Sequence, residues 1–405
     1  MAIYKEISAQ DIKTSSDSFE QSINIIQSYV SASSTRRKYQ NYVTGGIGPG
    51  VTSSLFQTVY DKDFSLQTAN PIFDVTFGLY QSSSTVTYSK TGTDSAGKML
   101  FPSTSLMMRE KVNIYKQFSS LLLGDPDGYF VAPFDSTTTT DRIDEAFFIC
   151  FKRLFHRDRI KRETFALRWY TTGSSNSTVG LHLTSYSGSA TYTDVGSSTN
   201  KLVSYGGNVG NIINSANTAE TVGLMFYDKG IAVLDLKKII STSEEVNGVI
   251  SAVNNTAGSS PTWAAGQTPI GITGKSENPN AKYIPDFVVS GSIDNILDHL
   301  CGCRMQSGSF TAMTFRNITN IHSTYIYCRI NPDDFNYSSN PTFTDSENRI
   351  VVIDPGQEDV QQTFSFFTTV GLYDANNNLV AVGKTSRPIE KNPEKDLTVT
   401  LKLDF

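Results

Sequence analysis

Residue types that bind zinc lie close together near position 300. The segment His299-Leu300-Cys301-Gly302-Cys303 is followed by His322 and Cys328. Thiolates and imidazoles hold structural zinc, but zinc ribbons pair their cysteines as Cys-x-x-Cys, and this segment has Cys-x-Cys. His299 also falls at the end of an expected helix. We therefore favour buried thiols and a helix-terminal histidine over a metal centre, and we predict no metal ligands.

A glycine-rich stretch, Gly45-Gly46-Ile47-Gly48-Pro49-Gly50, shares only its glycines with a phosphate-binding loop. A P-loop continues with Lys and then Ser or Thr, which are absent here. Pro49 also lacks the backbone N–H that would donate to a phosphate. The stretch predicts a structural turn, so we expect no nucleotide and no other cofactor.

Basic residues are densest between positions 153 and 162, and Trp169 and Tyr170 follow them. Such a run with aromatic neighbours could form a strip for nucleic acid. Asp158 and Glu163 interrupt it, and the formal net charge of the chain is −5, which disfavours phosphate-backbone binding. A turn that pairs its charges within the chain or with a protein partner is favoured. The basic residues are Arg153, Arg157, Arg159, Lys161 and Arg162.

No arrangement of residues predicts catalysis. The histidines at positions 156, 182, 299 and 322 stand in neither a Gly-x-Ser-x-Gly nor a His-Glu-x-x-His context. Asp333-Asp334 and Glu244-Glu245 are adjacent in sequence, which does not define the spatial geometry that a carboxylate pair needs. We expect a protein that is not an enzyme and has no catalytic residues.

Composition suggests a chain of extended surfaces and loops. Of its 405 residues, 38% are hydrophobic, 11% aromatic and 18% charged, and Ser, Thr, Asn and Gly fill much of the rest. The start carries no signal peptide, and no run reaches the ~20 apolar residues needed to span a bilayer. We expect a protein made in the cytosol that stays soluble or joins an assembly there, without membrane insertion.

The end of the chain has the clearest β pattern. From Leu397 to Phe405, apolar residues alternate with polar ones, which predicts a half-buried strand. Upstream, the apolar residues of 364–372 and 379–382 flank a turn at 374–378 and predict a hairpin. A proline-marked connection, Arg387-Pro388 to Asn392-Pro393, is expected between the hairpin and the last strand.

Helices are expected at a few places. Residues 104–123 carry an apolar stripe of Leu106, Ile114, Phe118, Leu121 and Leu122, ended by Gly124. Ser292 can cap a second helix that ends at Gly302. A third helix is expected from Ser16 or Asp17 through Phe19, Ile23, Ile26 and Val30, and 237–250 is a weaker helical segment.

The remaining segments predict strands and loops. Two strands are expected within 145–171 around the turn 156–159, a hairpin within 223–236 turning at 228–230, and further strands within 310–330. Residues 252–282 form a long polar loop. We predict a mainly β fold with a few helices (α+β), built of antiparallel sheets or β-sandwich modules with long loops. The expected domains are an N-terminal helix and arm (1–80), a central β-rich domain (81–345) and a C-terminal antiparallel module (346–405).

Segments along nearly the whole chain resemble virion structural proteins of contractile-tailed, T-even-like phages of the cyanophage type. The segments are VGLYD with LVAVGK and the following Arg387-Pro388, TGGIGPGVTSSLFQTVYDKDFSLQTANPIFD, FFICFKRLFHRDRIKRETFALRW, GLMFYDKGIAVLDL and CRINPDDFNYSSNPTF. The resemblance implies a non-enzymatic component of the tail, with a baseplate wedge subunit as the expected placement. It implies a location in the virion after assembly in the bacterial cytoplasm.

The partners implied are other tail and baseplate proteins, in multiple copies within a symmetric assembly, and no nucleic acid. Three alternatives stay open. The chain could attach a fibre or bind a receptor glycan through an exposed aromatic such as Trp263, it could belong to the neck or collar, or it could be a wall hydrolase. Glycan binding lost in Trp263→Ala would favour the first of these, and clearing of host peptidoglycan would favour the last.

Overall fold

The computed structural model divides into two compact units. One consists of Met1–Phe19 and Asn320–Phe405, here called the terminal unit, and the other of Glu20–Thr319, the central unit. This division cuts across the three segments predicted from the sequence, because the first and last parts of the chain fall in the same unit. The structure describes residues 4–26, 29–32, 35–38, 42–44, 54–62, 64–83, 86, 105–152, 158–175, 183–240, 287–305, 311–338, 340–347, 349–357 and 359–404.

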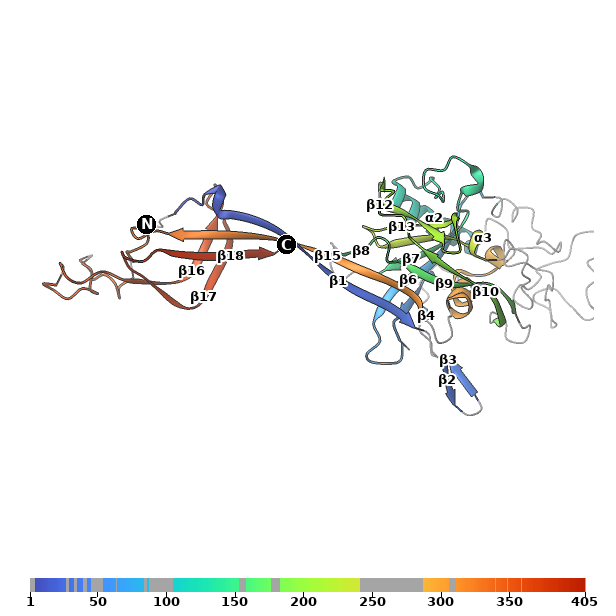
Figure 1. Ribbon diagram of the computed structural model, residues 1–405, viewed down its shortest axis with the longest axis horizontal. Helices are drawn as coiled ribbons and strands as arrows, with labels where there is room; N and C mark the ends of the chain where they lie inside the picture. Colours follow the sequence, from blue (N-terminus) through green and yellow to red (C-terminus); the bar gives the residue numbers. More distant parts are fainter. Residues whose placement is uncertain are drawn as a thin grey trace, which may run out of the picture. The chain divides into compact units, whose positions relative to one another are not determined.

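Strands dominate both units, and every defined strand pairing is antiparallel, which confirms the predicted mainly β, α+β class (Figure 1). Packing of sheets into a sandwich stays a prediction. The strands are β1 (Ile12–Ile26), β2 (Tyr29–Ala32), β3 (Thr35–Lys38), β4 (Tyr42–Thr44), β5 (Gln57–Tyr60), β6 (Pro71–Leu79), β7 (Glu145–Phe151), β8 (Asp158–Ile160), β9 (Ala166–Ser175), β10 (Leu183–Thr193), β11 (Leu202–Ser204), β12 (Gly207–Asn214), β13 (Asn217–Phe226), β14 (Ile231–Asp235), β15 (Thr311–Ile330), β16 (Ser365–Tyr373), β17 (Leu379–Lys391) and β18 (Leu397–Asp404).

The central unit is built on a sheet in which β9, β10, β12, β13, β14, β7, β6, β5 and β4 follow one another as neighbours. β7 and β14 are buried on both faces, as their uninterrupted apolar runs require. Phe147 and Leu234 belong to one hydrophobic cluster, together with Trp169 of β9. Phe148 and Val233, on the opposite face, belong to a second cluster.

Helix α2 (Leu106–Leu123) confirms the helix predicted at 104–123. The Ser105 hydroxyl accepts a hydrogen bond from the backbone N–H of Met108, and Gly124 ends the helix with a left-handed backbone, φ 79°. The predicted buried face was partly wrong, since Leu106 and Leu121 are exposed. The buried stripe is Met108, Lys111, Tyr115, Ser119 and Leu122.

The predicted Ser292 cap is also confirmed, because the Ser292 hydroxyl accepts from the N–H of Asn295 at the start of α5 (Ile293–His299). The predicted end at Gly302 was wrong, because the chain continues through Gly302 as a π-helical turn, Leu300–Arg304. In place of the longer helix predicted from 237, α3 (Leu236–Ile239) is a single turn, and residues 241–250 lie outside the described part. A short α4 (Val288–Ser290) precedes α5.

The helix predicted from Phe19 to Val30 was wrong, because this segment lies in β1 and β2. β1 is rich in Ser and Ile, which favour a helix less than Ala or Leu does, and it pairs with the 20-residue strand β15. The helical spacing of the apolar residues at 19, 23, 26 and 30 therefore did not produce a helix, because strand pairing is more favourable. Both β1 and β15 contribute residues to both units.

The hairpin predicted within 223–236 is confirmed by β13 and β14, which turn at 227–230 with Gly230 at φ 63°. The prediction for 145–171 was only partly right. β7 and β9 form there, with Phe165, Leu167 and Trp169 buried. They are not paired with each other, because β7 lies between β14 and β6 while β9 pairs with β10 and β15. Asp158 and Arg159, predicted in the turn, begin strand β8.

In the terminal unit the predicted hairpin is confirmed as β16 and β17, and the predicted alternating strand as β18. β18 pairs with β15 from Ile330↔Leu397 to Ser323↔Asp404. The expected connection from Arg387-Pro388 to Asn392-Pro393 was partly wrong, because β17 continues to Lys391 and the connection to β18 is formed by 392–396 alone. Pro388 sits where the register with β16 shifts, so the missing N–H breaks no regular ladder.

Candidate functional site

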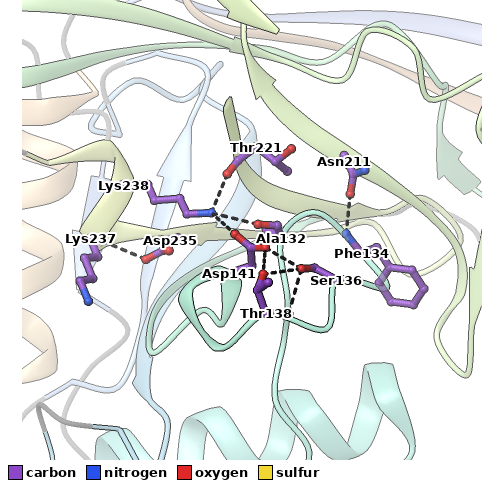
Figure 2. Close-up of polar contacts among 10 residues, drawn as sticks. All are labelled: Ala132, Phe134, Ser136, Thr138, Asp141, Asn211, Thr221, Asp235, Lys237 and Lys238. Atoms are coloured by element: carbon purple, nitrogen blue, oxygen red, sulfur yellow. Dashed lines mark hydrogen bonds and ion pairs between the residues drawn. The ribbon is translucent and has the colours of Figure 1, made fainter. Parts of the chain in front are cut away.

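A partly buried polar cluster lies in the central unit where α3 meets the loop 131–141 (Figure 2). Lys238 of α3 donates from Nζ to the carbonyl of Ala132 at 2.9 Å and to that of Thr221 at 3.0 Å. The same ammonium group lies 3.8 Å from Oδ1 of Asp141. Lys238 therefore joins the loop to β13 by two hydrogen bonds and an ion pair.

Asp141 organises the loop itself. Its Oδ2 accepts hydrogen bonds from the hydroxyl groups of Ser136, at 2.5 Å, and Thr138. These bonds hold the pKa of Asp141 below its ordinary value. The N–H of Phe134 donates to Oδ1 of Asn211 at 2.9 Å, which fixes the loop to β12 as well.

Asp235 caps the N-terminus of α3, where its Oδ1 accepts from the N–H of Lys237 at 3.0 Å. The side chain is buried, at 2% exposure, and this burial raises its pKa to about 7; the negative charge of Glu145 acts in the same direction. A carboxyl group with this pKa has the protonation range of a general acid or base. Its hydrogen bond to the helix terminus gives it a structural role in this chain.

Lys111 is another buried ionisable group that the sequence did not single out. It lies in the buried stripe of α2, and its Nζ donates to the carbonyls of Val288 and Val289 at 2.7 and 3.0 Å. Complete burial lowers the pKa of Lys111 to about 7. Its spacing from Met108 and Tyr115 on the helix could have signalled a buried position.

The zinc-type residues are placed in different parts of the fold. His299 is fully buried, and its Nε2 accepts a hydrogen bond from Nε of Arg304 at 2.9 Å, which puts the histidine proton on Nδ1. Cys301 is a buried cysteine of the central unit, whereas His322 and Cys328 belong to the terminal unit. Within the described residues, no three His, Cys, Asp or Glu side chains gather as a metal ion would require.

The basic run is partly described, since 153–157 lies outside the described residues. Lys161 pairs with Glu20, and Arg162 donates to Oδ1 of Asn208 at 3.0 Å while its guanidinium lies over the ring of Tyr227. Trp169 is fully buried against Phe147 and therefore presents no ring for base stacking. These contacts fit the interpretation that the charges pair within the chain.

Several sequence candidates fall outside the described residues: the glycine-rich stretch 45–50, the polar loop 252–282 with Trp263, the pair Glu244-Glu245, and the histidines at 156 and 182. Of the Asp333-Asp334 pair, Asp334 accepts hydrogen bonds from Lys5 and from the N–H of Asn331. These bonds hold the pKa of Asp334 below its ordinary value.

The terminal unit has a candidate binding surface that the sequence did not identify. Its described residues include three buried hydrophobic side chains, Ile330, Phe343 and Leu372, and both large hydrophobic clusters lie in the central unit. The hairpin of β16 and β17 meanwhile exposes large apolar side chains, which here form the hairpin patch. The hairpin patch consists of Phe366, Tyr373, Leu379, Val380 and Val382, each between 46% and 64% exposed.

Comparisons of this chain with protein-family models, with curated proteins and with solved structures each found no match. Among the helices in the described part, none is long and apolar enough to cross a membrane. The hairpin patch and the polar cluster around Lys238 are therefore interpreted from their own geometry.

Proposed function

We propose that this chain is a non-enzymatic structural component of a contractile phage tail, and specifically a baseplate wedge subunit that connects neighbouring virion proteins. The sequence segments quoted above support the phage-tail part of the proposal through their resemblance to such proteins. The wedge placement rests on that resemblance alone.

The observation that best supports a structural role is the imbalance between core and surface in the terminal unit. Burial of apolar side chains is the main favourable contribution to folding, and it must offset the ordering of the chain. A unit with few buried apolar side chains and an exposed hairpin patch gains stability when another protein covers that patch. A subunit of a permanent assembly meets this condition.

The polar cluster around Lys238 supports the same role indirectly. Its carboxylates and ammonium group are engaged in a helix cap, in loop hydrogen bonds and in two backbone carbonyl contacts. The helix cap and the two carbonyl contacts hold main chain in place, and the hydroxyl contacts hold the side chains of the loop. The cluster thus contributes rigidity to the central unit, which suits a structural subunit that connects other proteins.

A cryo-electron microscopy map of the phage particle tests the proposal directly. The expected result is density for this chain in the baseplate, at a copy number set by the baseplate symmetry, with contacts to at least two other virion proteins. Density in the neck or collar would contradict the wedge placement, and absence of the chain from purified particles would contradict the structural role.

A further inference from the structure

We infer that the free edge of β16 pairs antiparallel with β16 of a second copy of this chain, so that the hairpin patches of the two copies join. The inference rests on the proposed assembly role of the terminal unit and names one partner for it. It is carried by the edge of the strand, its sequence and the patch beside it.

β16 is an edge strand among the described residues. It pairs with β17 on one side, and this sheet has two strands. An unpaired strand edge presents a row of backbone N–H and C=O groups that another strand can use. Proteins normally protect such edges with charged side chains, proline or a covering segment.

β16 lacks those protective residues, whereas the other strands of the terminal unit's sheets have them. Its sequence, SFFTTVGLY, contains no charged residue and no proline. β17 carries Lys384, Arg387, Pro388 and Glu390, and β18 carries Lys402 and Asp404. An antiparallel pair of two β16 strands therefore brings no like charges together, so this edge is compatible with itself.

The hairpin patch adds exposed apolar surface beside this edge. Five large side chains that are about half exposed present several hundred Å² of apolar surface, on the order of the patches that mark protein interaction sites. Tyr373 and Leu379 lie across Gly371, since a Cβ there would be 3.0 Å from Cε2 of Tyr373 and 3.2 Å from Cδ1 of Leu379. Pairing of the two β16 edges would bring the hairpin patches of the two copies side by side in one antiparallel sheet.

Charge substitutions at Thr368 test the pairing. Thr368 is exposed near the middle of β16, at the register shift with β17, where its carbonyl accepts a hydrogen bond from the Thr385 hydroxyl at 3.2 Å. In an antiparallel pair centred near the middle of β16, position 368 of one copy lies close to position 368 of the other. Two lysines or two glutamates there would therefore repel each other. Thr400→Lys, at an exposed position of β18, is the matched control for the added charge.

The experiment is sedimentation velocity of the purified full chain over a range of micromolar concentrations, with circular dichroism to confirm folding. We expect a dimer for the unmodified chain and for Thr400→Lys, monomers for Thr368→Lys and for Thr368→Glu, and a dimer again in an equimolar mixture of those two variants. The recovered mixture distinguishes pairing from loss of folding.

A monomeric unmodified chain, or a Thr368→Lys variant that still dimerises, would overturn the inference. So would a mixture of the two variants that stays monomeric while both are folded. If the unmodified chain is monomeric yet is found in the baseplate density, the pairing is wrong and the proposed function stands. The two results are therefore separable.

Discussion

The side chain of Leu401 in β18 occupies the space that a side chain at Gly383 in β17 would need. A Cβ placed on residue 383 would overlap Cδ2 of Leu401. The hairpin of β16 and β17 thus packs on the strand at the end of the chain through a glycine and a leucine. Along β18, half-buried side chains alternate with exposed ones, and Leu401 is one of the half-buried side chains.

This contact predicts a coupling between the two positions. Gly383→Val alone should loosen the hairpin by forcing it away from Leu401, and Leu401→Ala alone should cost about 1–2 kcal/mol through lost packing. The double variant should lose less than the sum, because the smaller residue 401 makes room for the valine. Hydrogen-exchange protection of the β17 and β18 amides measures the local stability of the two strands in each single variant and in the double variant.

Additive losses in the double variant would show that the two residues do not share this space. Leu401→Asp should be more severe, because it places a charge on the apolar face of β18. If the proposed function is right, Leu401→Asp blocks incorporation into the particle. An infectious particle that carries this change would contradict the assigned role of β18.

The buried carboxyl of Asp235 predicts a stability that falls as pH rises. The pKa of Asp235 is about 7 in the folded chain and near its ordinary 3.8 when unfolded. Between these values the folded state holds a proton that the unfolded state has released, so the free energy of unfolding decreases with pH. Asp235→Asn keeps a capping side chain without the charge and should remove this slope.

Chemical denaturation at pH 5 and at pH 7.5 measures this slope. The free energy of unfolding should decrease by on the order of 2–3 kcal/mol between these two pH values. Asp141→Asn is a useful contrast. The pKa of Asp141 is lowered by its hydroxyl partners, so its contribution is present above its ordinary pKa and is lost on acidification. An unchanged slope in Asp235→Asn would rule out Asp235 as its source.

Lys111 predicts a pH dependence of the opposite sign. Its pKa is about 7 in the folded chain and 10.5 ordinarily, so between these values the unfolded state binds the extra proton. The free energy of unfolding should therefore rise as pH increases from 7 to 10, and Lys111→Met should flatten this rise. Lys116→Met, at a partly exposed position paired with Asp127, is the control and should leave the rise intact. The measurement is the thermal midpoint as a function of pH.

Lys238 predicts a local loss of stability. Lys238→Met would leave the carbonyls of Ala132 and Thr221 without this donor and should destabilise the central unit by about 1–3 kcal/mol. Lys237→Met, at the exposed neighbouring position, should change stability by less than about 0.5 kcal/mol. Urea denaturation followed by tryptophan fluorescence compares the two. Equal effects would mean that the contacts of Lys238 do not hold the loop.

The sequence determined the elements whose pattern is local. The alternation from Leu397 predicted β18, the turn residues at 374–378 predicted the β16–β17 hairpin, and Ser292 predicted the start of α5. These features depend on side-chain period, turn chemistry and capping, which act over a few residues. The mainly β class followed from the number of such segments.

Only the tertiary structure decided which strands are neighbours and which face of a helix is buried. β18 pairs with β15, some 70 residues earlier in the chain, and β1 is a strand because β15 offers it an edge. Lys111 is buried because carbonyls from residues 288 and 289 satisfy its ammonium group. Burial and pairing of this kind depend on residues distant in sequence, and local patterns carry no information about them.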